Sequence, residues 1–145
     1  MQDEKNIGIK HIIYTSRPLD SDNSDIENIL ISSERNNPKS EVTGLLIFGS
    51  KLYLQFLEGP ENSVDATFNR IKSDKRHNEI RILKESKSDR RLFASWTMRP
   101  QDLELMMWTP EDIESGLVEK FNSKQALNVF ENLSREFDQF LNPNK

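Results

Sequence analysis

The sequence contains no cysteine among its 145 residues, which excludes disulfide bonds, thiolate metal sites and cysteine catalysis. It has only two histidines, His11 and His77. A metal site normally needs three or more converging ligands, and no such set can be assembled from the sequence. Glycine is also scarce, at five residues, and no GxGxxG motif occurs. A nucleotide would therefore not be held by a glycine-rich phosphate loop.

Long apolar runs are missing as well. No run approaches the roughly 20 residues that a membrane-spanning helix needs, and residues 1–5 are polar, unlike the start of a signal peptide. The net charge of −4 argues against a general affinity for nucleic acid. We expect a soluble, cytoplasmic protein that contacts neither a membrane nor nucleic acid directly.

The spacing of apolar residues predicts alternating strands and helices. Strands are expected at residues 9–14, 42–48, 52–58, 79–83 and 92–98. One helix should begin at the capping box of Ser24 and end near Pro38. A second should begin near Pro60 and carry Val64, Phe68 and Ile71 on one face. This order predicts an α+β fold, a ferredoxin-like βαββαβ sheet of five strands with two helices on one face.

Two further helices are predicted near the C-terminus. The first follows a cap at Thr109 and Pro110, with Ile113, Leu117 and Phe121 along one face. The last has a longer apolar stripe, which consists of Ala126, Phe130, Leu133, Phe137 and Leu141. We expect both helices on the opposite face of the sheet, where they would complete the core.

Two polar side chains are unusual for a plain core. Tyr14 ends the first strand, and Gln55 lies in the most apolar strand of the chain. Burying an unpaired amide costs about 1–3 kcal/mol, so a buried Gln55 would need a partner. The structural alternatives are that Tyr14 is one more half-buried aromatic and that Gln55 faces solvent.

Other candidates also have structural alternatives. Asn36 and Asn37 could cap the first helix, and Trp96 could be core packing. Arg70 and Asp74 are four residues apart and could form a surface ion pair of little energetic value.

Together, several short segments resemble the BLUF family of blue-light sensors that use flavin. They are residues 13–17 (IYTSR), 35–37 (RNN), 42–44 (VTG), 54–60 (LQFLEGP), 74–77 (DKRH) and 96–98 (WTM). Their order and spacing together are specific to this family, and the resemblance covers about two thirds of the chain. The resemblance implies that residues 1–100 form the photosensor domain, and that residues 101–145 are a helical extension of the same compact unit.

The resemblance also implies site roles. Tyr14 would donate an electron and a proton to the excited flavin, and Gln55 would bridge the Tyr14 hydroxyl and the flavin edge. Asn37 would bind the O4/N3 edge of the ring. The remaining implied flavin neighbours are Ile29, Asn36, Arg70, Ile71, Asp74 and His77, with Trp96 and Met98 close to Gln55 on the fifth strand.

The function implied by this resemblance is photoreception without catalysis. The cofactor would be FAD, with FMN as the alternative. Light would rearrange the hydrogen bonds of Gln55, and the signal would leave through the C-terminal region to an unknown protein partner. We also expect a homo-oligomer, because symmetric assemblies are common.

Two other functions remain open, because a fold does not fix a function. The same topology could carry an acylphosphatase-type enzyme, although no glycine-rich anion cradle occurs near its start. It could also be a regulatory module for a colourless small molecule. Visible absorption separates these alternatives, since only a flavoprotein is yellow.

Overall fold

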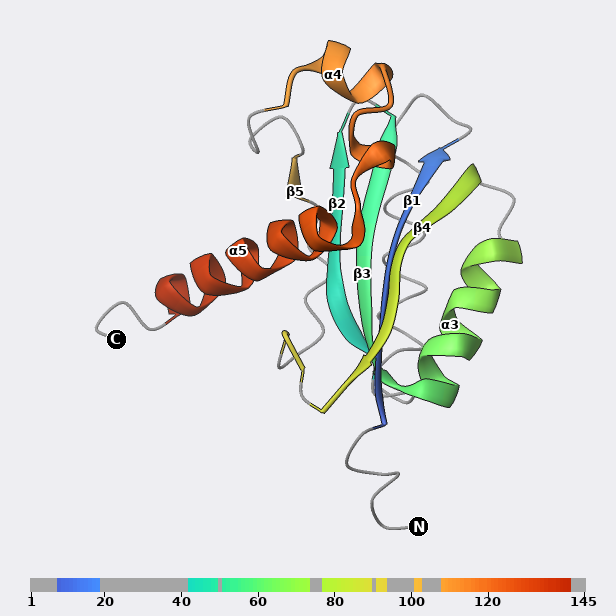
Figure 1. The fold of residues 1–145 in the computed structure, drawn as a ribbon, viewed down its shortest axis with the longest axis vertical. Helices are drawn as coiled ribbons and strands as arrows, with labels where there is room; N and C mark the ends of the chain where they lie inside the picture. The colour runs from blue at the N-terminus through green and yellow to red at the C-terminus, as the bar shows by residue number, and fades with distance from the viewer. Residues whose placement is uncertain are drawn as a thin grey trace.

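The computed structural model describes residues 8–18, 42–49, 51–73, 77–89, 91–93, 101–102 and 108–141. At its centre is a sheet with the strand order β4-β1-β3-β2-β5 (Figure 1). In chain order the elements are β1 (Ile9–Pro18), β2 (Thr43–Gly49), β3 (Leu52–Pro60), α3 (Glu61–Ser73), β4 (His77–Ser88), β5 (Gln101–Asp102), α4 (Pro110–Glu114), the 3₁₀ helix η2 (Val118–Lys120) and α5 (Ser123–Leu141).

The strands β1 to β4 confirm the predicted α+β class. β1 lies between β3 and β4, β3 lies between β1 and β2, and all these pairs are antiparallel. The hairpin between β2 and β3 is as expected from the sequence. The helix predicted between Ser24 and Pro38 falls outside the described residues. The complete βαββαβ unit therefore stays a prediction.

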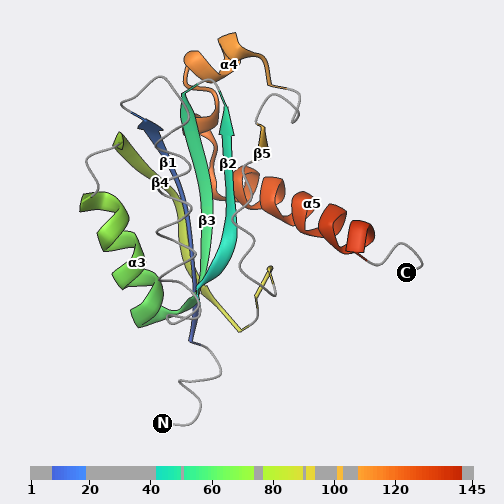
Figure 2. The same ribbon diagram turned by 180° about the vertical axis from the view of Figure 1, so that it is seen from behind.

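The two faces of the sheet are covered by different helices (Figures 1 and 2). Successive side chains of a strand point to opposite faces. In β3, Leu54 and Phe56 pack in one core cluster with residues of α4, η2 and α5, whereas Leu57 packs in a second cluster with residues of α3. The C-terminal helices thus lie on the face opposite to α3, as predicted.

The prediction of a fifth strand at residues 92–98 is wrong where it can be compared. Leu92 and Phe93 lie outside any strand, and residues 94–98 of the predicted strand fall outside the described residues. Within the described residues the fifth strand is the two-residue β5, parallel to β2. The physical reason is that two backbone amides in this segment have a side chain, and not a neighbouring strand, as their hydrogen-bond acceptor. The N–H groups of Leu92 and Phe93 donate to the side chain of Glu58 rather than to a neighbouring strand.

The first C-terminal helix is shorter than predicted. Thr109 caps α4 in a capping box with Asp112, as expected, but α4 ends at Glu114. Gly116 then adopts a φ of 87°, a left-handed conformation that ends a helix. Because the chain turns there, Leu117 is partly exposed and does not continue the apolar face of Ile113.

Gly44 in β2 is required by a close approach of two strands. A Cβ atom at this position would lie 1.9 Å from the carbonyl oxygen of Phe56 on β3. That oxygen belongs to strand backbone, so it cannot move aside without breaking the β2–β3 pairing.

We therefore expect Gly44→Ala to lower the free energy of unfolding by about 3 kcal/mol, because the two strands must separate. Gly116→Ala is the control, with an expected cost of about 1 kcal/mol from the left-handed backbone alone. Urea unfolding of both variants measures the difference. An equal or smaller loss for Gly44→Ala would contradict this explanation.

Candidate functional site

Tyr14 and Gln55 face each other across the centre of the sheet. They are partners in the register of β1 and β3, and the Tyr14 hydroxyl donates a hydrogen bond to the Gln55 amide oxygen. Tyr14 is 3% exposed and Gln55 is 1% exposed. The alternative of a solvent-facing Gln55 is therefore wrong. Each of these buried polar groups has the hydrogen bond that its burial requires.

Helix α3 supplies the apolar surroundings of this pair. Val64 and Phe68 from α3 pack in the same cluster as Tyr14, and the rings of Tyr14 and Phe68 lie 5.3 Å apart between centroids. The half-buried Ile71, one of the predicted flavin neighbours, packs against this cluster. The chain places α3 here because β3 runs directly into it at Pro60 and Glu61.

The other described candidates lie farther along α3 and at the start of β4. Arg70 is exposed, and its guanidinium donates to the Thr67 hydroxyl on the same helix at 3.3 Å. His77 opens β4, and its backbone is aligned with Pro18. The side chain of His77 lies outside the described residues, so its predicted place near a flavin side chain stays a prediction.

The remaining candidates fall outside the described residues. They are Ile29, Asn36, Asn37, Asp74, Trp96 and Met98. The described part of the chain thus brings together Tyr14, Gln55 and Ile71 on the α3 face, with Arg70 at its exposed margin. The implied contacts of the others stay predictions.

Sequence reasoning missed Arg17, which connects the sheet to the C-terminal region, and Glu58, which is buried on β3. Arg17, three residues after Tyr14, donates to both carboxyl oxygens of Glu119 at 2.6 and 3.1 Å and to the Ile113 carbonyl at 2.8 Å. Glu58 on β3 is fully buried. The sequence did contain a signal for Glu58. It follows Leu54 and Phe56 at intervals of two residues, so its side chain points to the same buried face of the strand.

Lys10, four residues before Tyr14 on β1, connects α3 to the sheet by ion pairs. Its ammonium lies 2.6 Å from Asp65 on α3 and 2.8 Å from Glu85 on β4. Burial alone would lower the pKa of Lys10, but the hydrogen bonds to Asp65 and Glu85 outweigh it. The pKa of Lys10 is therefore raised above its ordinary value of 10.5.

The comparison with family models decides the family. Residues 9–99, more than half of the chain, match the model described as sensors of blue-light using FAD, the BLUF model. The chain belongs to the BLUF family. The BLUF match begins at the first residue of β1 and includes β2, β3, α3 and β4, which carry the whole described site.

Curated relatives and solved structures agree with this membership. The chain is 30% identical over 131 residues to the blue light- and temperature-regulated antirepressor BluF of Escherichia coli, covering 90% of this chain and 32% of that protein. It is 28% identical over 121 residues to the photoactivated adenylate cyclase subunit beta of Euglena gracilis. That match covers 81% of this chain but spans only 14% of the cyclase subunit.

Among solved structures, the dark state of the BLUF protein BlrB superposes with a TM-score of 0.75 at 25% identity. The match covers 90% of this chain and 98% of BlrB. In the described portion of our BLUF chain, none of the helices has the length and apolar character needed to cross a membrane. The same residues contain no group of three or more side chains suited to a metal ion.

The ion pairs of Lys10 give a test of how α3 is held. We expect Lys10→Met to lower the free energy of unfolding by about 1 kcal/mol at neutral pH, because both carboxylates are partly exposed and screened. A raised folded pKa means that this contribution is fully present below the unfolded pKa. It is lost as the pH rises through the folded value.

Unfolding of wild type and Lys10→Met at about pH 8 and pH 11.5 measures this change, since the difference between them should shrink at the higher pH. Lys87→Met is the control, because Lys87 is 61% exposed and contacts only Glu61 among the ion pairs of the described chain. A Lys10→Met difference that grows with pH would contradict the assignment.

Proposed function

We propose that this chain is a blue-light photoreceptor in which Tyr14 and Gln55 form the photoactive pair and FAD, or alternatively FMN, is the chromophore. The observation that carries the proposal is the buried hydrogen bond between these two side chains, in a chain that belongs to the BLUF family. The acylphosphatase and colourless-ligand alternatives give no reason for this pair.

The chemistry of the pair fits a flavin ring. A flavin has a polar edge with hydrogen-bond acceptors and a donor on a flat apolar ring. Gln55 has an amide with both donors and an acceptor, and Tyr14 has a hydroxyl that does both. Both lie on the face of the sheet against which α3 packs its apolar side chains Val64, Phe68 and Ile71. In the proposed site Asn36, Asn37 and Ile29, on the helix predicted before Pro38, complete the surroundings of the ring in the ferredoxin-like arrangement.

In this proposal a bound flavin would absorb blue light and would supply the acceptor for an electron and a proton. The Tyr14 hydroxyl would give both to the flavin and would later regain both from it. The Gln55 amide meanwhile rotates or changes tautomer, since an amide can satisfy its partners in more than one arrangement. The result is a network with two hydrogen-bonded states, which is what a switch requires.

We further propose that the signal leaves through the C-terminal helices to a protein partner. Arg17 supports this route, because it connects β1, the strand of Tyr14, to Ile113 and Glu119. Ser123, at the start of α5, donates to the Leu83 carbonyl on β4 at 3.1 Å. Related proteins named as cyclases and an antirepressor join light to an output, and here we assign the output to partner binding.

A visible spectrum of the protein purified with flavin tests the function. We expect a yellow protein whose absorption shifts reversibly to the red under blue light and returns in the dark. A colourless protein would contradict flavin binding. A yellow protein without the shift would contradict photoreception.

Two variants test the photoactive pair. We expect Tyr14→Phe and Gln55→Leu to keep the flavin and to lose the red-shifted state, because one lacks the redox-active hydroxyl and the other lacks the switchable amide. Tyr53→Phe is the matched control, since it removes a hydroxyl from the same face of β3 two residues from Gln55. The control should retain the shift. A normal photocycle in either Tyr14→Phe or Gln55→Leu would disprove the mechanism.

A further inference from the structure

Glu58 is a buried acidic side chain that the proposed photochemistry does not use. It lies on β3 with no exposed surface, on the same face as Leu54 and Phe56, which pack with residues of α5. Its lateral neighbours are His11 on β1 and Thr43 on β2, by the register of the two pairings. Burying a carboxyl group is costly unless donors surround it, so the placement demands a reason.

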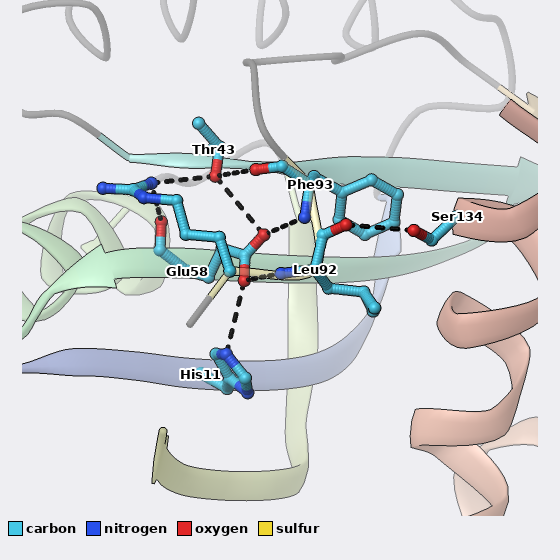
Figure 3. Close-up of polar contacts among 7 residues, drawn as sticks. His11, Thr43, Glu58, Leu92, Phe93 and Ser134 are labelled. Atoms are coloured by element: carbon cyan, nitrogen blue, oxygen red, sulfur yellow. Dashed lines mark hydrogen bonds and ion pairs between the residues drawn. The ribbon is translucent and has the colours of Figure 1, made fainter. Parts of the chain in front are cut away.

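The carboxyl group is directed at one segment of backbone. Leu92 donates its N–H to Oε1 of Glu58 at 2.6 Å, and Phe93 donates its N–H to Oε2 (Figure 3). Neither residue belongs to a strand. Glu58 therefore provides acceptors for two successive backbone amides that form no ladder with a neighbouring strand.

Neighbouring side chains support the same attachment. The Thr43 hydroxyl donates to the Phe93 carbonyl at 2.9 Å, and Arg91 donates to the Thr43 oxygen at 2.9 Å. His11 places Nε2 3.3 Å from Oε1 of Glu58. Residues 91–93 are thus bonded to both β2 and β3.

The same segment also contacts the C-terminal helix. Ser134 on α5 donates to the Leu92 carbonyl at 3.0 Å (Figure 3). The rings of Phe56 on β3 and Phe93 are 5.5 Å apart, and Phe56 also contacts Phe130 on α5 at 5.2 Å. Residues 91–93 are therefore bonded both to the sheet and to α5.

We propose that Glu58 is a positioning residue of the photoreceptor, which fixes residues 91–93 against β3 and thereby couples the photoactive pair to α5. This inference rests on the function proposed above. Gln55 and Glu58 are three residues apart on β3, about 10 Å along the strand and on opposite faces. Phe93 precedes Trp96 by three residues, so the fixed segment leads directly into the residues expected beside Gln55.

The coupling follows from this geometry. A segment that is not bonded to β3 would not follow a displacement of that strand. Because Leu92 and Phe93 are bonded through two amides to Glu58, they transmit such a displacement through the Leu92 carbonyl to Ser134. A purely structural anchor would affect stability alone. A positioning residue also alters how much α5 responds to light.

Glu58→Gln is the decisive variant, because it keeps the shape of the side chain but replaces one acceptor oxygen with a donor facing a backbone N–H. We expect flavin binding and the red shift to remain, since Tyr14 and Gln55 lie on the other face. Amide exchange at residues 92 and 93 should become about tenfold faster in the dark. The light-minus-dark change in hydrogen exchange across α5 should fall to less than half.

Glu61→Gln is the matched control, with the same substitution three residues later at a side chain that is 44% exposed. It should leave both exchange measurements as in the wild type. Glu58→Gln with a wild-type light response of α5 would overturn the inference. If Glu58→Gln does not fold, Ser134→Ala decides, because it removes only the bond from α5 to the Leu92 carbonyl.

For Ser134→Ala, a reduced light response of α5 with a normal red shift supports the inference, and an unchanged response overturns it. Failure of the proposed function looks different. In that case the wild-type protein itself shows no red shift. The role of Glu58 alone is refuted if the wild-type protein shows the red shift and the Glu58→Gln variant shows the same light-minus-dark change in hydrogen exchange across α5 as the wild type.

Discussion

The pairing of β1 with β3 at the centre of the sheet is the constraint on which the rest depends. In a single register it places Tyr14 opposite Gln55 and His11 opposite Glu58. Since side chains alternate between faces, the first couple lies under α3 and the second under the C-terminal helices. A shift of β3 by one residue would move Gln55 and Glu58 to the opposite faces, away from Tyr14 and His11. The register is held by the buried apolar residues of β3 that lie between the two couples.

Much of this arrangement follows from local patterns in the sequence. The apolar run of β3 and the turn before it predict the hairpin, and Val64 and Phe68 predict the buried face of α3. An amide in so apolar a strand identifies Gln55 as a residue in need of a partner. The identity of that partner could not be derived from pattern alone, because the register of β1 and β3 is a long-range property. Resemblance to a family supplied it.

The errors have the same physical origin. The run that starts at Leu92 is apolar enough for a strand, but the amides of Leu92 and Phe93 bond to a side chain 34 and 35 residues earlier. No local pattern reports such a contact. At Gly116 the spacing of Ile113, Leu117 and Phe121 favoured a continuous helix, and a single left-handed glycine overrode it. Helical periodicity shows which residues could share a face, whereas a turn decides whether the helix reaches them.

The two polar couples differ in a way that suits different tasks. An amide presents a donor and an acceptor on opposite sides, so rotating Gln55 changes what each neighbour experiences. A carboxylate presents two equivalent acceptors, so rotating Glu58 changes nothing. In the proposed photoreceptor Gln55 can therefore store a state, and Glu58 can only hold its two amides in place. A switch that stores a state must act against something that stays fixed. Gln55 and Glu58 are three residues apart on β3. This strand therefore provides the switchable group on one face of the sheet and the fixed group on the other.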